Sequence, residues 1–299
     1  MKILVTGGTV FASRYTAEYF AEKGHDVYVL NRGNRPQSSN VHHICKDRYS
    51  LGDELKQLFF DAVLDVTSYN VNDVRTLNEA LGEYENYIFI SSSAVYPETL
   101  PQPFREDMEC GANSIWGEYG TNKLAAEEWL GEHVPNAYIL RPPYLYGTMN
   151  NLYREAFVFE CAEENRPFYV PKDGSMKLQF FHIDDMCRFM ELLLSLKPEQ
   201  HIFNVGNPQA VSIAEWVQKC YSVVGKKPEL RFVSGDVPQR SYFPFYDYEY
   251  MLDVSAMCRI MSELKPFEEG LNDSYRWYRE NRGLIVRKPL LEYISQSFK

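Results

Sequence analysis

A tyrosine and a lysine four positions apart, Tyr119 and Lys123, stand in the segment GEYGTNKLAAEEWL, which is rich in helix-forming residues. On an α-helix, positions i and i+4 share one face, with their Cβ atoms roughly 5–6 Å apart. An ammonium group held that close to a phenol favours the phenolate and lowers a pKa that is ordinarily about 10. The spacing therefore predicts a candidate proton-transfer pair at the start of a helix.

The same spacing occurs a second time, in Tyr19 and Lys23. Tyrosine is frequent in this chain, with 22 copies in 299 residues, so chance alone is expected to produce such a pair. One of the two pairs is then incidental. The elements around each pair must decide which one.

The composition is that of an acidic globular chain, with 45% hydrophobic residues, 24% charged residues, a formal net charge of −10 and a pI of about 5.2. This charge argues against non-specific binding to nucleic acid or to an anionic membrane. No stretch approaches the roughly 18 apolar residues of a membrane span, and MKILVTGG is too short an apolar run for a signal peptide. We therefore expect a cytoplasmic protein with neither a membrane nor a nucleic acid as partner.

The cysteines and histidines do not form a metal-binding pattern. The six cysteines are scattered without CxxC spacing, and the six histidines include no HExxH. Metal and disulfide frameworks need closer clusters. We expect reduced thiols and no metal site.

The elements that must position the Tyr-Lys pair alternate between strand and helix over the first two-thirds of the chain. Helical patterns span 11–23, 71–83 and 119–132, and β-rich apolar runs cover 2–6, 26–30, 41–45, 61–66, 87–91 and 137–141. Continuous apolar strands that alternate with helices indicate a parallel sheet covered on both faces. The sequence therefore predicts an α/β fold with a doubly wound parallel (Rossmann) sheet.

The pattern changes after Gly147. Helical patterns at 151–164, 184–195 and 212–223 surround a strand at 201–205, and the tail 226–299 is rich in aromatic residues and proline. This predicts a smaller C-terminal substrate lobe over the ligand-binding edge of the sheet. We assign 1–148 to the nucleotide-binding domain, with 177–207 returning to it, and 149–176 and 208–299 to the substrate lobe.

A glycine-containing loop, VTGGTVFAS at 5–13, joins the first strand to the first helix. Such loops hold a dinucleotide diphosphate on helix N-terminal amides, and glycines let the backbone approach it. The usual spacing places further glycines at the positions of Val10 and Ser13, so the side chain of Val10 must point away from the phosphates. The alternative is a degenerate loop without a cofactor. Candidate phosphate-binding residues are Gly7, Thr9, Val10 and Phe11.

The residues after the second strand suggest the identity of the cofactor. An acidic residue there would hold the ribose 2′-hydroxyl of NAD, whereas arginine suits a 2′-phosphate. Asn31 and Arg32 supply no acid, and Arg35 is nearby. We expect NADP, with NAD and a plain solvated loop as the alternatives.

Several motifs, in order, resemble the extended short-chain dehydrogenase/reductase family, in its NAD(P)-dependent epimerase/dehydratase group. Beside the glycine loop, the ending at 243–281 resembles the chloroplast stem-loop-binding branch and its bacterial relatives. The other motifs are YIFISSSAVY (87–96), YGTNK (119–123), LRPPYLYG (140–147), FFHIDDM (180–186) and FNVGNPQAVSIAEW (203–216).

The resemblance decides between the two Tyr-Lys pairs. It implies that Tyr119 is the general acid/base and that Lys123 lowers its pKa and holds the nicotinamide ribose. The pair Tyr19 and Lys23 ends the first helix, away from the ligand edge, and is incidental. A serine would hydrogen-bond the reacting oxygen. The motif implies Ser92, with Ser93 as the alternative.

The resemblance implies further contacts with the cofactor and the substrate. Asp47 and Arg48 would lie at the adenine, Val66 and Thr67 at the ribose and diphosphate, and Pro142 at the nicotinamide. For the substrate, the arginine fork of Arg240 suits a diphosphate. The substrate-facing candidates are Ser93, Tyr96, Tyr144 and Arg240.

Two functions follow as expectations. The first is a nucleotide-sugar epimerase or reductase that acts by hydride transfer at a sugar carbon. Dehydratases of this family carry an Asp-Glu pair after the catalytic serine or threonine, whereas this chain has Ser93-Ala94, which disfavours dehydration. The second is a non-catalytic or RNA-binding protein of the same fold. The retained Ser, Tyr and Lys and the net charge favour the enzyme. The expected partner is a small-molecule nucleotide sugar, and a homodimer is left open.

Overall fold

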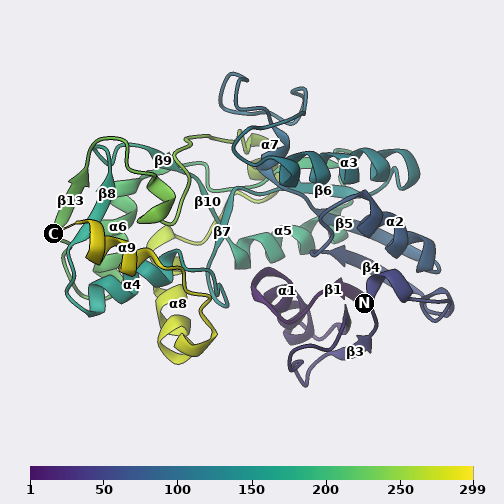
Figure 1. Ribbon diagram of the computed structural model, residues 1–299. Helices are drawn as coiled ribbons and strands as arrows, with labels where there is room; N and C mark the ends of the chain where they lie inside the picture. The colour runs from purple at the N-terminus through teal and green to yellow at the C-terminus, as the bar shows by residue number, and fades with distance from the viewer. Residues whose placement is uncertain (299) are drawn as a thin grey trace.

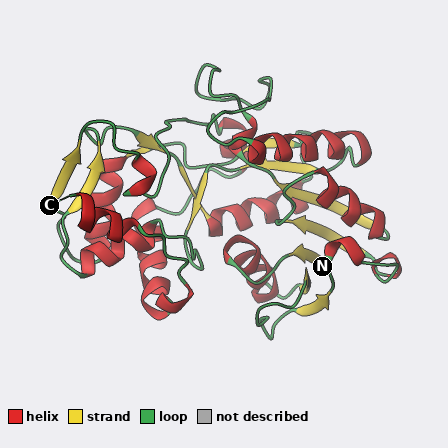
Figure 2. Ribbon diagram, viewed as in Figure 1, coloured by secondary structure: helices red, strands yellow, loops and turns green. Residues whose placement is uncertain are grey.

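A seven-stranded, all-parallel sheet forms the larger lobe of the protein, which the computed structural model describes for residues 1–298 (Figures 1 and 2). Its strand order is β11-β6-β5-β4-β1-β2-β3, so the order reverses between β1 and β4. All the strands predicted for this sheet are present, and the predicted fold class is confirmed. Their bounds are β1 (Lys2–Thr6), β2 (Asp26–Asn31), β3 (His42–Cys45), β4 (Phe60–Asp65), β5 (Tyr84–Ile90), β6 (Tyr138–Arg141) and β11 (Ile202–Asn204).

Helices cover both faces of this sheet because its strands are apolar on both sides. Side chains such as Val5 and Phe20 share one core with α1 and α5, whereas Leu4, Leu77 and Leu130 share the other core with α2 and α3. The sheet is therefore doubly wound. The helices are α1 (Phe11–Glu22), α2 (Val71–Ala80), α3 (Glu118–His133) and α5 (Ile183–Leu196).

A smaller lobe lies beside the carboxyl edge of the sheet (Figure 1). Its strands β8 (Phe168–Pro171) and β13 (Leu230–Val233) pair in parallel. Its helices are α4 (Glu155–Glu163), α6 (Ile213–Val223), α8 (Phe267–Glu280) and α9 (Leu290–Ser297), and the short helix α7 (Ser255–Ile260) contacts β11. The boundaries proposed for the two lobes stay a prediction.

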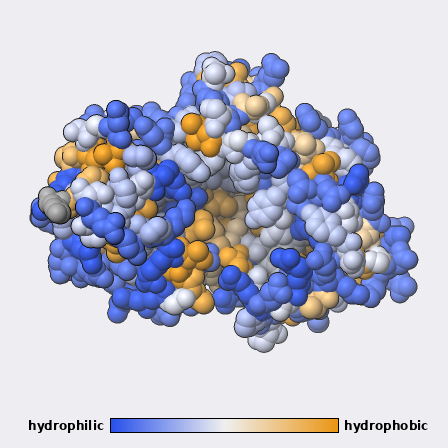
Figure 3. All heavy atoms as spheres, viewed as in Figure 1, coloured by the Kyte–Doolittle hydropathy of each residue, from blue (hydrophilic) through white to orange (hydrophobic). Residues whose placement is uncertain are grey.

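Short parallel and antiparallel pairs connect the lobes. Strand β7 (Tyr144–Tyr146) pairs with β10 (Phe180–His182), and β9 (Lys177–Leu178) pairs with β12 (Val211–Ser212). A space-filling view shows a hollow between the two lobes, with apolar side chains at its floor (Figure 3). Within residues 1–298, no helix combines the length and the apolarity needed to cross a membrane.

Candidate active site

The glycine loop at the end of β1 has the backbone conformation that its sequence requires. Gly7 and Gly8 have φ angles of +94° and +86°, a region that favours glycine. A Cβ atom at Gly7 would lie 2.6 Å from Cγ2 of Thr67, so a side chain does not fit there. Helix α1 begins directly after this loop at Phe11, and no side chain caps its first amides. The loop therefore leaves N–H groups free to bind an anion.

A cavity of about 430 Å³ lies beside Gly7, at the carboxyl ends of β1, β2 and β4. It brings together six residues that the sequence assigned to the cofactor, and the size of the cavity suits a nucleoside. Its lining residues are Gly7, Leu30, Asn31, Arg32, Lys46, Asp47, Arg48, Tyr49, Thr67, Tyr69, Asn70 and Asp73.

The predicted cofactor residues in this cavity differ in what they can still bind. Arg48 donates to the Thr67 hydroxyl at 2.9 Å and also contacts the Ser68 hydroxyl. Asp47 accepts from the amide of Tyr49 at 2.9 Å and so caps the 3₁₀ turn Arg48–Ser50. Arg32 is exposed and has no ion-pair or hydrogen-bond partner within residues 1–298.

Asn31 lines this cavity, and the polar groups of its side chain are already hydrogen-bonded within the protein. Its amide nitrogen donates to the carbonyl oxygen of Gly7 at 2.6 Å and to Gln37 at 2.7 Å, and its oxygen accepts from the amide of Gly33 at 2.9 Å. These bonds use the groups that a ribose would need. Asn31 therefore positions the loops around the cavity.

Apart from Tyr119 and Lys123, five predicted cofactor residues lie outside this cavity. Val66 is 8% exposed and its amide donates to the Thr6 hydroxyl, and the carbonyl of Pro142 accepts from the amide of Ser93 at 3.0 Å. These two residues support the strands that end at the site. The other three line a separate cavity on the outer side of the glycine loop; these are Thr9, Val10 and Phe11.

Lys123 is buried below the ligand edge of the sheet. Its side chain is 2% exposed, and Nζ donates to the backbone oxygens of Ser68 at 2.6 Å and Ile90 at 2.7 Å. Burial lowers the pKa of Lys123 to about 8. The carbonyl contacts fix the ammonium group at the carboxyl ends of β4 and β5.

The expected effect of Lys123 on Tyr119 is wrong for this structure. The pKa of Tyr119 is raised, because the phenol lies in the cleft where its anion is poorly solvated, and hydrogen bonding with Ser92 only partly opposes this. The ammonium group of Lys123 points instead toward the two carbonyl oxygens. Even so, Tyr119 keeps 41% of its surface open to solvent, so a ligand in the cleft can reach it.

The second Tyr-Lys pair has a structural role. The hydroxyl of Tyr19 donates to Glu191 at 2.7 Å, and Lys23 forms a 3.4 Å ion pair with the same carboxylate. These contacts join α1 to α5 on the side of the sheet opposite α3. The position of this pair matches the interpretation that it is incidental to chemistry.

Tyr119 faces a cavity of about 340 Å³ between the lobes. Ser92 and Ser93 both line it, but Ser93 is 4% exposed and donates to the hydroxyl of Tyr250 at 3.1 Å. Ser92 is half-buried and lines the cavity together with Tyr119, and its hydroxyl accepts from the amide of Ala94 at 3.2 Å. The geometry therefore favours Ser92. The lining residues are Ser92, Ser93, Trp116, Tyr119, Pro143, Tyr144, Arg154, Tyr246 and Tyr250.

Tyr96 does not face this cavity, which contradicts the sequence prediction. It is fully buried, its hydroxyl donates to Asn204 at 2.8 Å, and it accepts from Arg141 at 2.7 Å. Arg141 is itself paired with the buried carboxylate of Glu127 at 2.6 Å. The Tyr96 hydroxyl satisfies this buried ion pair, and this explains its direction.

The cavity continues into a smaller one of about 120 Å³ that carries several positive charges. Tyr144 and Arg154 line both cavities, and Arg240 and Lys288 line the smaller one. The pKa of Lys288 is lowered by burial and by the neighbouring Arg240 and Arg154. No acidic side chain among the described residues lines either cavity, although the chain is acidic overall.

Sequence reasoning found Tyr144 and Arg240 but missed other lining residues. Arg154 directly precedes α4, and Trp116 lies three positions before Tyr119, without a motif around either. The alternating tyrosines at 246, 248 and 250 were the available signal, since a period of two places alternate side chains on one face. In residues 1–298, no three His, Cys, Asp or Glu side chains gather in a way that could hold a metal ion.

A sequence profile of the NAD dependent epimerase/dehydratase family matches residues 3–206. The chain belongs to this family. This result agrees with the glycine loop, the parallel sheet and the Tyr-Lys helix. It also confirms the family resemblance that the sequence motifs indicated.

Individual relatives are distant. The chain is 27% identical to the chloroplast stem-loop binding protein of 41 kDa b of Arabidopsis thaliana, over 92% of this chain and 78% of that protein. A solved structure of UDP-glucuronic acid 4-epimerase from Bacillus cereus, in complex with UDP-glucuronic acid and NAD, aligns with a TM-score of 0.73 and 20% identity, over 94% of this chain and 99% of that one. UDP-glucose 4-epimerase from Thermotoga maritima, with UDP-glucose, aligns with a TM-score of 0.75 and 19% identity, over 94% and 100%. At these identities, the structures establish the fold alone.

Proposed function

We propose that the protein is an NADP-dependent nucleotide-sugar epimerase or reductase in which Ser92, Tyr119 and Lys123 are the catalytic residues. The proposal rests on the arrangement of three cavities. Ser92 and Tyr119 meet in a cavity that lies between a nucleoside-sized cavity at the glycine loop and an acid-free pocket lined by cations. Family membership supports this reading, because it is a family of NAD-dependent enzymes.

The residues at the sheet edge suit a dinucleotide. The glycine loop offers free amides to the diphosphate, and Arg32, without a carboxylate partner, suits a 2′-phosphate. When bound, NADP supplies the hydride acceptor and donor. Lys123 is held at the ends of β4 and β5, where it could donate to the nicotinamide ribose.

Proton transfer is the task of Tyr119 and Ser92. The raised pKa keeps the phenol protonated at rest, so Tyr119 can donate a proton to a carbonyl oxygen of the substrate. In the oxidative direction, Tyr119 must first lose its own proton before its phenolate can accept that of the sugar hydroxyl, and the raised pKa opposes this step. Ser92 would hydrogen-bond the same oxygen and hold it against Tyr119.

The cationic pocket suits the diphosphate of a nucleotide sugar. Arg240 is held by its contact with the Pro244 carbonyl and by the ring of Tyr246, 4.6 Å from its guanidinium carbon. Arg154 stacks over Tyr144 at 5.0 Å. Guanidinium groups bind phosphate oxygens bidentately, and aromatic walls can contact a sugar or a base. The proposed substrate therefore spans both cavities.

RNA binding is the second candidate, and one observation favours it. The relative that covers 92% of this chain is named as a stem-loop binding protein. The net charge of −10 opposes this function, because binding to the phosphate backbone relies on clustered basic residues. A gel-shift titration with an RNA stem-loop would detect it.

A substrate panel tests the proposed function. The protein would be incubated with NADP⁺ or NADPH and a set of nucleoside diphosphate sugars, with product formation followed by mass spectrometry. We expect at least one sugar to be epimerised or reduced, and Tyr119→Phe to lower turnover by about 10²–10⁴-fold. Tyr19→Phe is the matched control. Turnover by Tyr119→Phe equal to that of the unmutated protein would reject the assignment.

A further inference from the structure

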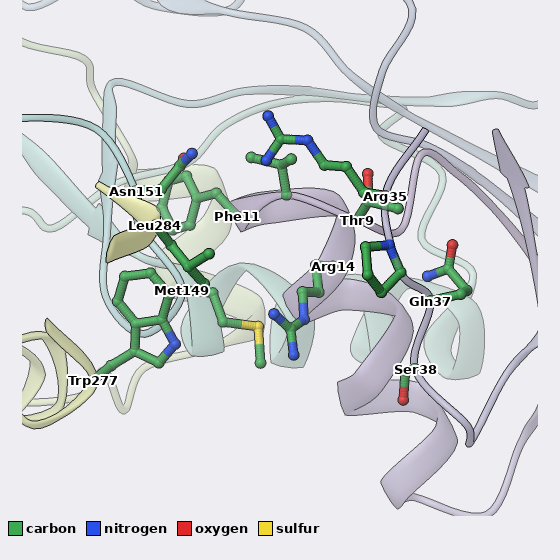
Figure 4. A pocket seen from close by; sticks show the side chains of 12 residues that line it. Thr9, Phe11, Arg14, Arg35, Gln37, Ser38, Met149, Asn151, Trp277 and Leu284 are labelled. Carbon is green, nitrogen blue, oxygen red and sulfur yellow. The ribbon is translucent and has the colours of Figure 1, made fainter. Parts of the chain in front are cut away.

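The two arginines that the sequence assigned to a 2′-phosphate lie in different cavities. Arg32 lines the nucleoside-sized cavity, on one side of the glycine loop. Arg35 lines a cavity of about 370 Å³ on the outer side of that loop, between α1 and the smaller lobe. Figure 4 shows the Arg35 side chain reaching over the start of α1 toward Asn151, with Trp277 and Leu284 on the opposite wall. The two side chains can therefore serve different parts of one ligand.

Hydrogen bonds fasten the loop that carries Arg35 to the glycine loop. Asn31 donates to the oxygen of Gly7 at 2.6 Å and to Gln37 at 2.7 Å, and Gln37 donates to the oxygen of Gly8 at 2.6 Å. Both loops therefore hold one relative position. The place of Arg35 beside the start of α1 follows from these bonds.

Three groups at this cavity have hydrogen-bonding capacity to spare. Arg35 is exposed and forms no ion pair or hydrogen bond within the described chain, whereas Arg14, in the same lining, is paired with Glu18 at 2.7 Å. The first amides of α1 have no side-chain cap at Val10. From the other lobe, Asn151 is 7% exposed and its Oδ1 has no partner among the described residues.

Val10 affects how close a diphosphate can come to these free groups. It stands where the usual spacing of such loops has glycine, and its branched side chain lines the outer cavity. Side-chain bulk at the point of closest approach keeps a diphosphate further from the helix amides. A guanidinium group on a long side chain can reach a diphosphate in that more distant position.

We propose that Arg35 binds the cofactor diphosphate across Val10, and that Arg32 alone recognises the 2′-phosphate. This inference rests on the proposed NADP site and deepens it. Arg35 then contributes to every nicotinamide dinucleotide, because all of them contain the diphosphate. Arg32 contributes only to those that carry the extra phosphate. Arg35 also replaces the contact that glycine at position 10 would allow.

Fluorescence titration of NADPH and of NADH separates these roles without any substrate. We expect Arg35→Ala to raise the Kd for both nucleotides by the same factor, about ten- to a hundredfold for a lost charged contact. Arg32→Ala should raise the Kd for NADPH by a similar factor and leave that for NADH within about twofold. Arg14→Ala is the matched control in the same cavity, and it should change neither. Val10→Gly in the Arg35→Ala background should recover part of the lost affinity for both nucleotides.

Three results would overturn the inference, and they have different meanings. A loss confined to NADPH in Arg35→Ala would make Arg35 a second 2′-phosphate ligand. Unchanged affinity for both nucleotides would leave it without a role in binding. Failure of the unmutated protein to bind either nucleotide would reject the proposed NADP site itself, together with this inference. Because Arg35 is exposed and unpaired, thermal unfolding of Arg35→Ala should match that of the unmutated protein and exclude misfolding as the cause.

Discussion

At the scale of single residues, the proposed chemistry depends on which of two adjacent serines faces the cavity with Tyr119. Ser92 lies between β5 and the 3₁₀ turn Ser93–Val95, has an extended backbone and is half-buried at the cavity, whereas Ser93 is buried and donates to the hydroxyl of Tyr250. Of these two neighbouring residues, Ser92 can therefore contact a substrate, whereas Ser93 stabilises the wall of the cavity.

This difference predicts unequal effects of the two serine substitutions. Ser92→Ala should lower turnover by about 10²-fold, the usual effect of removing one donor to a reacting oxygen. Ser93→Ala should lower turnover far less, because it removes only a contact with Tyr250. Steady-state kinetics on a substrate found in the panel would measure both. The reverse order would show that Ser93 is the catalytic serine.

The sequence could predict the residue types at this site but not all of their directions. Ser92 follows the end of β5, and Tyr119 and Lys123 begin the helix that comes after this strand, so the parallel fold brings them to one edge. Tyr96 was misplaced because its direction is set by the buried pair of Arg141 and Glu127, which are distant in sequence. The sequence could not predict the raised pKa of Tyr119 either, since it depends on how the cleft surrounds the ring.

At the scale of elements, helix α3 must approach the turn that carries Ser92. Gly120 makes this possible, because a Cβ atom there would collide with the carbonyl oxygen of Ala94. Tyr119, the catalytic candidate, directly precedes Gly120 in α3. The close approach of α3 to the turn therefore sets the distance between Tyr119 and Ser92.

Replacing Gly120 with alanine should therefore destabilise the protein, even though alanine has the higher helix propensity. We expect Gly120→Ala to lower the free energy of unfolding by about 1–3 kcal/mol through overpacking, and to lower turnover as α3 moves outward. Gly131→Ala is the control in the same helix. It meets no atom within 4 Å and should raise stability by roughly 0.5–1 kcal/mol. Urea unfolding of both variants checks this, and equal effects would contradict the packing argument.

Elements were the most predictable level of this protein. The apolar runs predicted every strand of the main sheet. The central strands are buried on both faces and have a simple pattern, whereas the edge strand β3 is mostly exposed. Helix α2 ends at Ala80, short of the predicted 83, because Gly82 packs tightly against the backbone of Lys56. The small lobe was predicted in outline only, since its short strands β8 and β13 pair across about 60 residues of sequence.

At the scale of the whole molecule, the junction between the lobes contains one buried carboxylate without a cationic partner in hydrogen-bonding contact. Glu155 is 3% exposed, and its only side-chain bond is from the amide of Asn150 at 2.9 Å. Burial raises its pKa to about 7, although Arg154 opposes this. Because the folded state holds the proton more tightly than the unfolded state, stability falls as the pH rises from about 4.5 to about 7.

Glu155→Gln should remove this pH dependence. Near pH 5 the carboxyl group is protonated in the folded protein and glutamine is a close mimic, so the variant should gain little. Near pH 8.5 the variant should be more stable than the unmutated protein, and its advantage should have grown by roughly 2–3 kcal/mol. Denaturant unfolding at both pH values measures the difference. An advantage that does not change with pH would mean that Glu155 is already ionised in the folded state at acidic pH.

We propose that Lys123 is part of a cofactor site, and a fluorescence titration of NADPH tests this most directly. Lys123→Ala should raise the Kd for NADPH by about tenfold or more, as expected for a lost charged hydrogen bond. Lys23→Ala removes the lysine of the other pair, which joins α1 to α5, and should leave the Kd unchanged. Thermal unfolding of both variants would show whether each remains folded. Equal affinities of two folded variants for NADPH would contradict the assignment of the cofactor site to this helix.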